Sequence, residues 1–280
     1  MNIFQAIVLG IVQGLTEFIP VSSSAHLIIV PWALGWSDPG LTFDVALHLG
    51  TLVALLVFFA KDWARLIRAG VASIVERKLG DDADRRLAWL IVIGSIPGAI
   101  AGVLAESKIE ELFHAPNAPH NSSAMIAMGV IIALLGAVLF IVERIAQHVR
   151  ALNAASFKDA IWIGLAQALA IFPGVSRSGA TITAGLALGF QRDAAARFSF
   201  LLAAPIIAGA GAKSLFNLYR DGLKSSELMP FAVGFLTAAI TGYFCIRFLL
   251  SYLQKNSADI FVYYRWLLAA FVIAFALVRG

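Results

Sequence analysis

The chain has 280 residues, of which 60% are hydrophobic and only 14% carry a charge, whereas a soluble domain has about 25% charged residues. Together with a mean hydropathy of +0.85, this composition excludes a disordered chain, a collagen-like chain and an ordinary cytosolic enzyme, and it indicates an integral membrane protein. The net charge of +4 fits basic cytoplasmic loops better than nucleic-acid binding, and the single cysteine, Cys245, excludes an internal disulfide or a multi-cysteine metal site.

The first 36 residues form an apolar stretch that is interrupted in its middle. Pro20 and the run Ser22–Ser24 disfavour a continuous helix there, and each half is too short to cross about 30 Å of hydrocarbon. No Lys or Arg precedes Lys61, so a cleavable signal peptide is not expected. We predict a re-entrant hairpin over residues 1–36, whose turn is buried in protein or lines a wet cavity.

Six later stretches are long and apolar enough to be full transmembrane helices. They cover residues 42–60, 87–105, 124–142, 195–216, 230–253 and 263–279. Between the third and the fourth, residues 159–190 show the interrupted pattern again, with Pro173-Gly174 followed by Ser176-Arg177-Ser178. The sequence therefore predicts an all-α integral membrane protein, in which six transmembrane helices are combined with two re-entrant helical hairpins, residues 1–36 and 159–190.

Basic residues between the predicted spans indicate an orientation. The connection 61–86 holds seven Lys and Arg residues, whereas the connection 106–123 holds only Lys108. Cytoplasmic loops are enriched in Lys and Arg, so 61–86 is predicted to be cytoplasmic. Alternation along the chain then places both termini outside.

The two interrupted stretches are related in sequence. Residues 10–24 (GIVQGLTEFIPVSSS) align without gaps with residues 164–178 (GLAQALAIFPGVSRS), and seven positions are identical. Three spans follow each hairpin, and an odd number of spans per half inverts one half relative to the other. We therefore predict an inverted-topology repeat within one membrane domain, residues 1–280, with halves 1–150 and 151–280 and with the hairpin turns meeting near the midplane.

Glu17 is the only charged residue of the first hairpin and Arg177 is the only one between residues 160 and 190. An ionisable group in an apolar segment is costly, so both are expected to be functional and to face a partner. Gln13 and Glu17 share a helix face, where they can bind a divalent cation through oxygen or fix a catalytic water. The alternative is a structural Glu17–Arg177 pair that ties the hairpins together.

Each serine run stands at the start of a returning helix. Helix starts expose N–H groups that suit phosphate, although plain capping is the alternative for any single serine. Arg177 can bind phosphate oxygens in pairs, and His26, three residues after Ser23, is a candidate base or nucleophile, or else a hydrogen-bonded core histidine. Asp44 and His48 share a face of the first span and either support the site or form a hydrogen-bonded pair at membrane depth. The predicted phosphate-binding serines are Ser22, Ser24, Ser176 and Ser178.

These residues resemble the motifs of a known family. The segment QGLTEFIPVSSSAH, residues 13–26, resembles the (E/Q)xxxE motif and serine–histidine turn of bacterial undecaprenyl-diphosphatases, and PGVSRSGAT, residues 173–181, resembles their PGxSRSxxT motif. The likeness extends over the whole chain in length and segment order. It implies hydrolysis of undecaprenyl diphosphate to undecaprenyl phosphate and inorganic phosphate, which recycles the lipid carrier for peptidoglycan synthesis and confers bacitracin resistance.

The resemblance also implies a divalent cation, Mg²⁺ or Ca²⁺, which we expect at Gln13 and Glu17, and a phosphate-binding role for Thr181. Ser23 is the preferred nucleophile with His26 as its base, and nucleophilic attack by His26 itself is the variant. The expected partners are a polyprenyl diphosphate lipid and the membrane, with a homodimer left open and nucleic acid not expected. The implied location is the bacterial plasma (inner) membrane, with the site opening to the periplasmic or outer face. The alternative function is a lipid-phosphate transporter or flippase that uses the same midplane site.

Overall fold

The computed structural model describes residues 1–113, 122–221 and 225–279, and within these ranges the regular elements are helices. The first half contains α1 (Ile3–Thr16), α2 (Ser23–Leu34), α3 (Leu41–Phe58), α4 (Ala60–Val75), α5 (Ala83–Phe113) and α6 (Ser122–Ile145). The second contains α7 (Phe157–Ala168), α8 (Arg177–Ala187), α9 (Arg192–Asp221), α10 (Ser225–Leu253) and α11 (Asp259–Arg279). Two short 3-10 turns, η2 (Leu152–Ala154) and η3 (Leu169–Ile171), precede and follow α7.

Five of the described helices are long and apolar enough to cross a bilayer, and α3 with α4 makes a sixth candidate if this bent pair counts as one span. The five lie in α5, α6, α9, α10 and α11. The prediction of an all-α membrane protein is therefore confirmed. The predicted outer connection 106–123 is helical as far as Phe113, and its residues 114–121 lie outside the described part of the chain.

The predicted connection 61–86 is corrected by the structure, because its residues 61–75 lie in the helix α4. This helix turns by 79° from α3 at the break around Phe59. Its apolar residues alternate with Lys61, Asp62, Arg65 and Arg68, so a search for uncharged stretches passes over it although the helical period is present.

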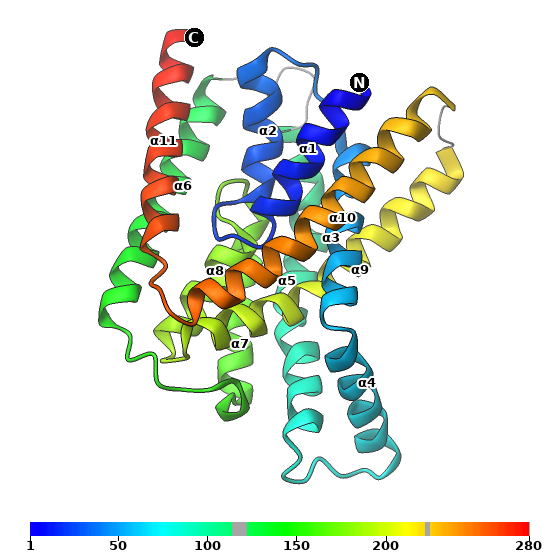
Figure 1. Cartoon of the computed structure of the whole chain (residues 1–280), viewed down its shortest axis with the longest axis vertical. Coiled ribbons are helices and arrows are strands. Elements are labelled where there is room, and N and C mark those ends of the chain that lie inside the picture. Colours follow the sequence, from blue (N-terminus) through cyan, green and yellow to red (C-terminus); the bar gives the residue numbers. More distant parts are fainter. Residues whose placement is uncertain (114–121, 222–224, 280) are drawn as a thin grey trace.

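The two predicted hairpins are present as pairs of short helices, α1 with α2 and α7 with α8 (Figure 1). The longest of the four, α1, has 14 residues and so is only about 21 Å long, which is less than the hydrocarbon thickness of about 30 Å. Figure 1 shows α1 running inward from the end of the molecule where both termini lie, and α7 running inward from the opposite end. Both termini share one end, as predicted; which end is outside stays a prediction.

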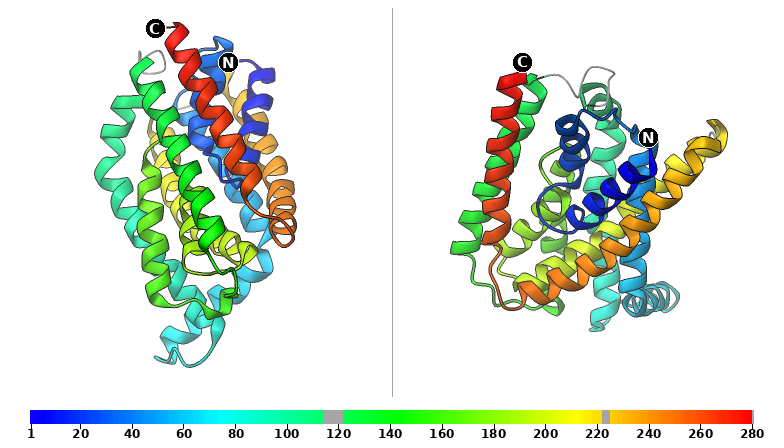
Figure 2. Two further views of the ribbon diagram at one scale, coloured as in Figure 1. Left: turned by 90° about the vertical axis from the view of Figure 1, so that its left-hand side faces the viewer. Right: turned by 45° about the horizontal axis from the view of Figure 1, so that its top comes forward.

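Close glycine contacts hold the first helix of each hairpin against a long helix. A Cβ on Gly10 in α1 would lie 2.8 Å from the carbonyl oxygen of Gly234 in α10, and a Cβ on Gly164 in α7 would lie 2.4 Å from the carbonyl oxygen of Gly94 in α5. Gly10 and Gly164 are equivalent in the predicted repeat, and each makes the same kind of contact with a long helix of the other half. The inverted repeat and its boundaries stay a prediction, which these contacts favour. The helices α6 and α11 pack against each other at one side of the molecule (Figure 2).

An ion pair fixes the start of the second hairpin. Arg150 donates from both terminal nitrogens to the carboxylate of Asp159, at 2.6 and 3.1 Å, and also to the carbonyl of Leu188. Burial raises the pKa of Asp159, but hydrogen bonds from Arg150 and Ser156 outweigh it and hold this pKa below its usual value. The same hydrogen bond raises the pKa of Arg150. Both groups are thus charged at neutral pH.

Candidate active site

The turns of the two hairpins are in direct contact. The N–H of Gly174 in the second turn donates to Ser22 Oγ in the first, at 3.2 Å, and Ser178 Oγ donates back to the carbonyl of Ile19, at 3.1 Å. The prediction that the turns meet is therefore confirmed, and each turn supplies one of the two connecting hydrogen bonds.

Equivalent serines cap the two returning helices in the same strained conformation. Ser22 is the N-cap of α2 with a φ of 78°, and Ser176 is the N-cap of α8 with a φ of 71°. A left-handed backbone at a residue other than glycine costs about 1–3 kcal/mol and persists only where the surroundings hold it. Both serines accept a backbone N–H three residues on, from Ala25 and Gly179, so the capping alternative holds for them.

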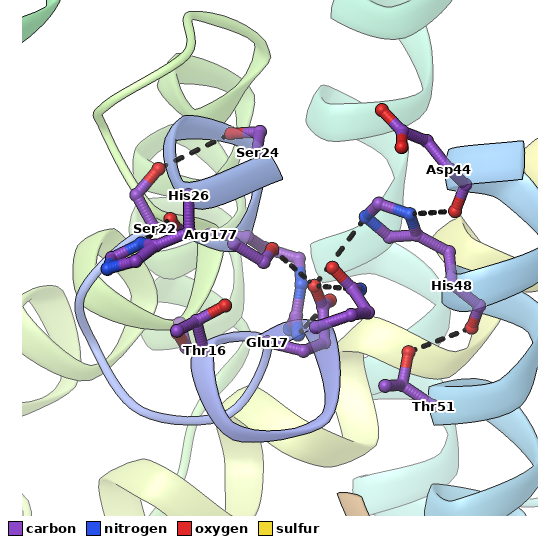
Figure 3. A network of polar contacts seen from close by, with 12 residues as sticks. Thr16, Glu17, Ser22, Ser24, His26, Asp44, His48, Thr51 and Arg177 are labelled. Atoms are coloured by element: carbon purple, nitrogen blue, oxygen red, sulfur yellow. Dashed lines mark hydrogen bonds and ion pairs between the residues drawn. The ribbon is translucent and has the colours of Figure 1, made fainter. Parts of the chain in front are cut away.

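The carboxylate of Glu17 is the centre of a polar network between the hairpins (Figure 3). Its Oε2 accepts hydrogen bonds from Ser23 Oγ at 2.6 Å and from Gln13 Nε2 at 3.0 Å, and its Oε1 accepts from Arg177 Nη2 at 3.1 Å. The Nε2 of His48 lies 3.6 Å from Oε2. Glu17 is only 5% exposed, so a carboxylate that is almost entirely desolvated contacts both a hydroxyl and a guanidinium.

Ser23 and Arg177 are the first residues of α2 and α8 and are equivalent in the predicted repeat. Each therefore stands where the unpaired N–H groups of a helix start are available to an anion. Arg177 also donates from Nη1 to the carbonyl of Ser199 at 3.2 Å, and its Nε is buried with no hydrogen-bond partner among the described residues.

A cavity of about 310 Å³ opens beside this network. One part of its wall is polar and another is apolar. The polar residues that line it are Glu17, Ser23, Ser24, Asp44, His48, Ser176 and Arg177. The apolar wall includes Leu27 of α2, Val45 of α3 and Ile206, Ile207 and Ala210 of α9. Such a cavity suits a ligand with a charged head and a hydrocarbon tail.

Among the predicted site residues, Glu17, Ser23, Ser24, Ser176 and Arg177 line this cavity. Ser22 and Ser178 instead join the turns, as described above. Thr181 donates to the carbonyl of Arg177 at 2.8 Å and shares a 2.6 Å hydrogen bond with Ser199. Thr181 thus supports the first turn of α8 from behind.

His26 lies away from Ser23 in the structure. Its Nδ1 is 2.7 Å from the carbonyl of Ser22 and its Nε2 is 2.7 Å from the hydroxyl of Tyr264. A carbonyl only accepts, so Nδ1 carries the hydrogen and Nε2 accepts from Tyr264. Both ring nitrogens are engaged, and Figure 3 shows His26 on the opposite side of the network from His48. The expected contact between His26 and Ser23 is absent, and the Ser23 hydroxyl instead donates to Glu17.

Three further polar residues lie in or behind the site. For Asp44 and His48 the sequence left a supporting role and a hydrogen-bonded pair as alternatives, and both residues line the cavity. Arg265, which lies outside the cavity, was not predicted from the sequence, although a buried charge within a predicted span is the same signal that marked Glu17 and Arg177. Its contacts with both turns are described below.

The residues present fit a divalent cation. Gln13 Oε1 is buried and has no hydrogen-bond partner in the part of the chain that the structure describes, and amide and carboxylate oxygens are suitable ligands for Mg²⁺ or Ca²⁺. The Glu17–Arg177 ion pair in the cavity wall carries no net charge, so a divalent cation would add the positive charge that an anionic ligand needs. Within the described ranges no three His, Cys, Asp or Glu side chains cluster as metal ligands, so other ligands would come from substrate or water.

Comparison with known proteins identifies the family. A family model described as "Bacitracin resistance protein BacA" matches residues 6–271. Proteins named undecaprenyl-diphosphatase are similar over nearly the whole chain. The one from Desulforudis audaxviator is 48% identical over 280 residues, covering 100% of both chains. The one from Thermomicrobium roseum is 47% identical over 265 residues, covering 95% of both. The chain therefore belongs to the bacitracin resistance protein family.

Proposed function

We propose that this protein hydrolyses undecaprenyl diphosphate to undecaprenyl phosphate and inorganic phosphate, and so returns the lipid carrier to peptidoglycan synthesis and confers bacitracin resistance. The relatives are named for this activity. The observation that carries the proposal is the contact of one carboxylate, Glu17, with the Ser23 hydroxyl at 2.6 Å and the Arg177 guanidinium at 3.1 Å, on the wall of a cavity that is otherwise mostly apolar.

Ser23 is the nucleophile in this proposal and Glu17 is its base. The short hydrogen bond points the hydroxyl proton of Ser23 at Glu17 Oε2, so the proton moves to the carboxylate as Oγ attacks the terminal phosphorus. A bond forms between Oγ and phosphorus, and the bond from phosphorus to the bridging oxygen breaks. Undecaprenyl phosphate leaves with the electron pair of that bond. His26, with both nitrogens engaged, holds the Ser22 carbonyl.

Arg177 and the two helix starts stabilise the charge of the phosphate. Arg177 has one nitrogen on Glu17, one on the Ser199 carbonyl and its Nε unpartnered. The Nε and the free N–H groups of the first turns of α2 and α8 can donate to the terminal phosphate oxygens. Preorganised donors of this kind cost no rearrangement when charge develops in the transition state.

A divalent cation, Mg²⁺ or Ca²⁺, completes the proposal. Gln13 and Glu17 would hold it, and when bound it would neutralise diphosphate charge and polarise the phosphoryl oxygens. Glu17 passes the proton it took from Ser23 to the departing undecaprenyl phosphate and is a carboxylate again. In the second half of the cycle Glu17 takes a proton from a water molecule, whose oxygen attacks the phosphorus on Ser23. The bond from phosphorus to Ser23 Oγ breaks, Glu17 returns the proton to Oγ, and inorganic phosphate is released.

We also propose a location for the protein and a binding surface for its lipid substrate. In this proposal the protein lies in the bacterial plasma membrane, and its cavity opens to the periplasmic or outer face. The apolar cavity wall of α2, α3 and α9 suits the first prenyl units of the lipid.

Phosphate release from the purified protein in detergent, with farnesyl or undecaprenyl diphosphate, tests the proposal. We expect release that is abolished by EDTA and restored by Mg²⁺ or Ca²⁺. A transporter or flippase requires two compartments and would release no phosphate in detergent. Activity that survives EDTA would remove the cation from the mechanism but leave the hydrolysis.

A further inference from the structure

Arg265 of α11 is the largest fully buried side chain of the described protein, at 1% exposure. Among the described residues no carboxylate lies within ion-pair distance of it. Its guanidinium instead donates to four backbone carbonyls. Nε donates to Ile132 of α6 at 3.2 Å and Nη1 donates to Pro20 at 3.1 Å, while Nη2 donates to Gly174 at 2.8 Å and to Val175 at 3.1 Å.

These carbonyls belong to the two serine turns and to the helix behind them. Pro20 precedes the N-cap Ser22 by two residues, and Gly174 and Val175 directly precede the N-cap Ser176. One planar guanidinium therefore contacts the backbone of both turns at once. A buried charge without a counterion is expensive, and a planar fork of five donors is the side chain best suited to satisfy several carbonyls in fixed directions.

The neighbouring residue of α11 supports the first turn as well. The Tyr264 hydroxyl contacts His26 Nε2, and His26 Nδ1 donates to the carbonyl of Ser22. The backbone of the first turn is therefore held at two points from α11, and that of the second turn at two carbonyls by Arg265. Because these carbonyls face α11, the strained backbones of Ser22 and Ser176 are fixed from behind the cavity.

We propose that Arg265 is a positioning residue: it sets the distance between the two serine turns, so that Ser23 of one and Arg177 of the other act on the same phosphate. This inference rests on the proposed phosphatase function. Arg265 does not line the cavity, and so it acts through the turns and not on the substrate. Misplacement of reacting groups by about 1 Å commonly costs about a hundredfold in rate, so the effect should appear in kcat.

The test compares Arg265→Lys and Arg265→Gln with the wild type in detergent, by phosphate release from farnesyl diphosphate and by melting temperature. Arg279→Lys is the matched control, since Arg279 lies on the same helix and also donates to a carbonyl, that of Trp32 at 2.6 Å, but at the end of the first hairpin away from the turns. All assays are run well below the lowest melting temperature, so that kcat refers to folded protein.

We expect Arg265→Lys to lower kcat about a hundredfold and to leave KM within about threefold, whereas Arg279→Lys leaves both unchanged. A purely structural role would lower the melting temperature and leave kcat of the folded variants near the wild-type value, which would overturn the proposal. Failure of both Arg265 variants to fold would also overturn it, because Arg265 would then serve the fold itself. A wild type that releases no phosphate would instead refute the proposed function, whatever the variants do.

Discussion

Replacing Glu17 by glutamine removes the proposed base with little change in shape. The variant keeps an amide oxygen that can accept from Arg177, but the acceptor 2.6 Å from the Ser23 hydroxyl becomes neutral and poorly basic. Loss of a positioned general base costs about 10²–10⁴ in rate. Arg177, which the 3.1 Å contact with Glu17 orients, loses its charged partner as well, so we expect kcat/KM to fall about 10³-fold, which is about 4 kcal/mol of transition-state stabilisation.

The stability of Glu17→Gln should fall less than is usual for a broken buried ion pair, which costs about 3–5 kcal/mol. Arg177 borders the cavity, with 13% of its side chain exposed, so water can partly solvate the unpaired guanidinium. The effect on turnover should therefore exceed the effect on melting temperature.

Gln167→Leu is the matched control for Glu17→Gln. Gln167 occupies the position of Gln13 in the second hairpin, but Ile171 stands where Glu17 would be. Both polar atoms of the Gln167 amide are buried and have no hydrogen-bond partner within the described ranges. Removing an unsatisfied buried amide is expected to be neutral or stabilising, so activity should stay near the wild-type value. Phosphate release from farnesyl diphosphate and thermal melting measure both variants. Near-normal turnover in Glu17→Gln, or equal losses in both variants, would refute the base assignment.

Three further predictions concern the Arg177 guanidinium, the orientation in the membrane and the ion pair at the start of the second hairpin. Arg177→Lys should lower kcat/KM at least about tenfold at an unchanged yield of folded protein, because lysine offers a point donor in place of a planar fork; near-normal turnover would leave only the structural tie to Glu17. A cysteine at Ser37 should react with an impermeant reagent added from outside and a cysteine at Asp81 should not, with the buried Cys245 replaced in both; the opposite pattern would reverse the orientation. Asp159→Asn should lower the melting temperature at neutral pH and flatten its decline in acid. The pKa of Asp159 in the folded protein is held below its usual value. The carboxylate therefore stabilises the fold above the pKa of the unfolded state, and this stabilisation is lost as the pH falls through the pKa of the folded state. Melting temperatures that decline in parallel with pH in the variant and the wild type would contradict this.

The hairpins and their meeting point were predictable from sequence because each depends on residues that leave a local mark. Pro20 and Pro173 interrupt apolar stretches, and the serine runs supply the caps at Ser22 and Ser176. The functional weight of Glu17 and Arg177 followed from the cost of a charge in an apolar segment. The structure brings these two into contact although they are 160 residues apart.

The surroundings of His26 and Arg265 were not predictable in the same way. His26 follows Ser23 by three residues, which leaves their directions about 60° apart around the helix. Because of this difference, Ser23 faces the cavity and His26 faces α11. Whether such a residue faces one neighbour or the other depends on how the helix is rotated in the assembled fold. The four partners of Arg265 are backbone carbonyls, and these leave no signature in the side-chain sequence.

The account is tested most directly by an experimental structure of the protein with a non-hydrolysable methylene analogue of farnesyl diphosphate and Mg²⁺. It predicts the terminal phosphorus about 3–3.5 Å from Ser23 Oγ, with Arg177 donating to the terminal phosphate and the prenyl chain along the wall formed by Leu27, Val45 and Ile206. A terminal phosphate bound elsewhere, or one that meets His26 in place of Ser23, would contradict the proposed mechanism.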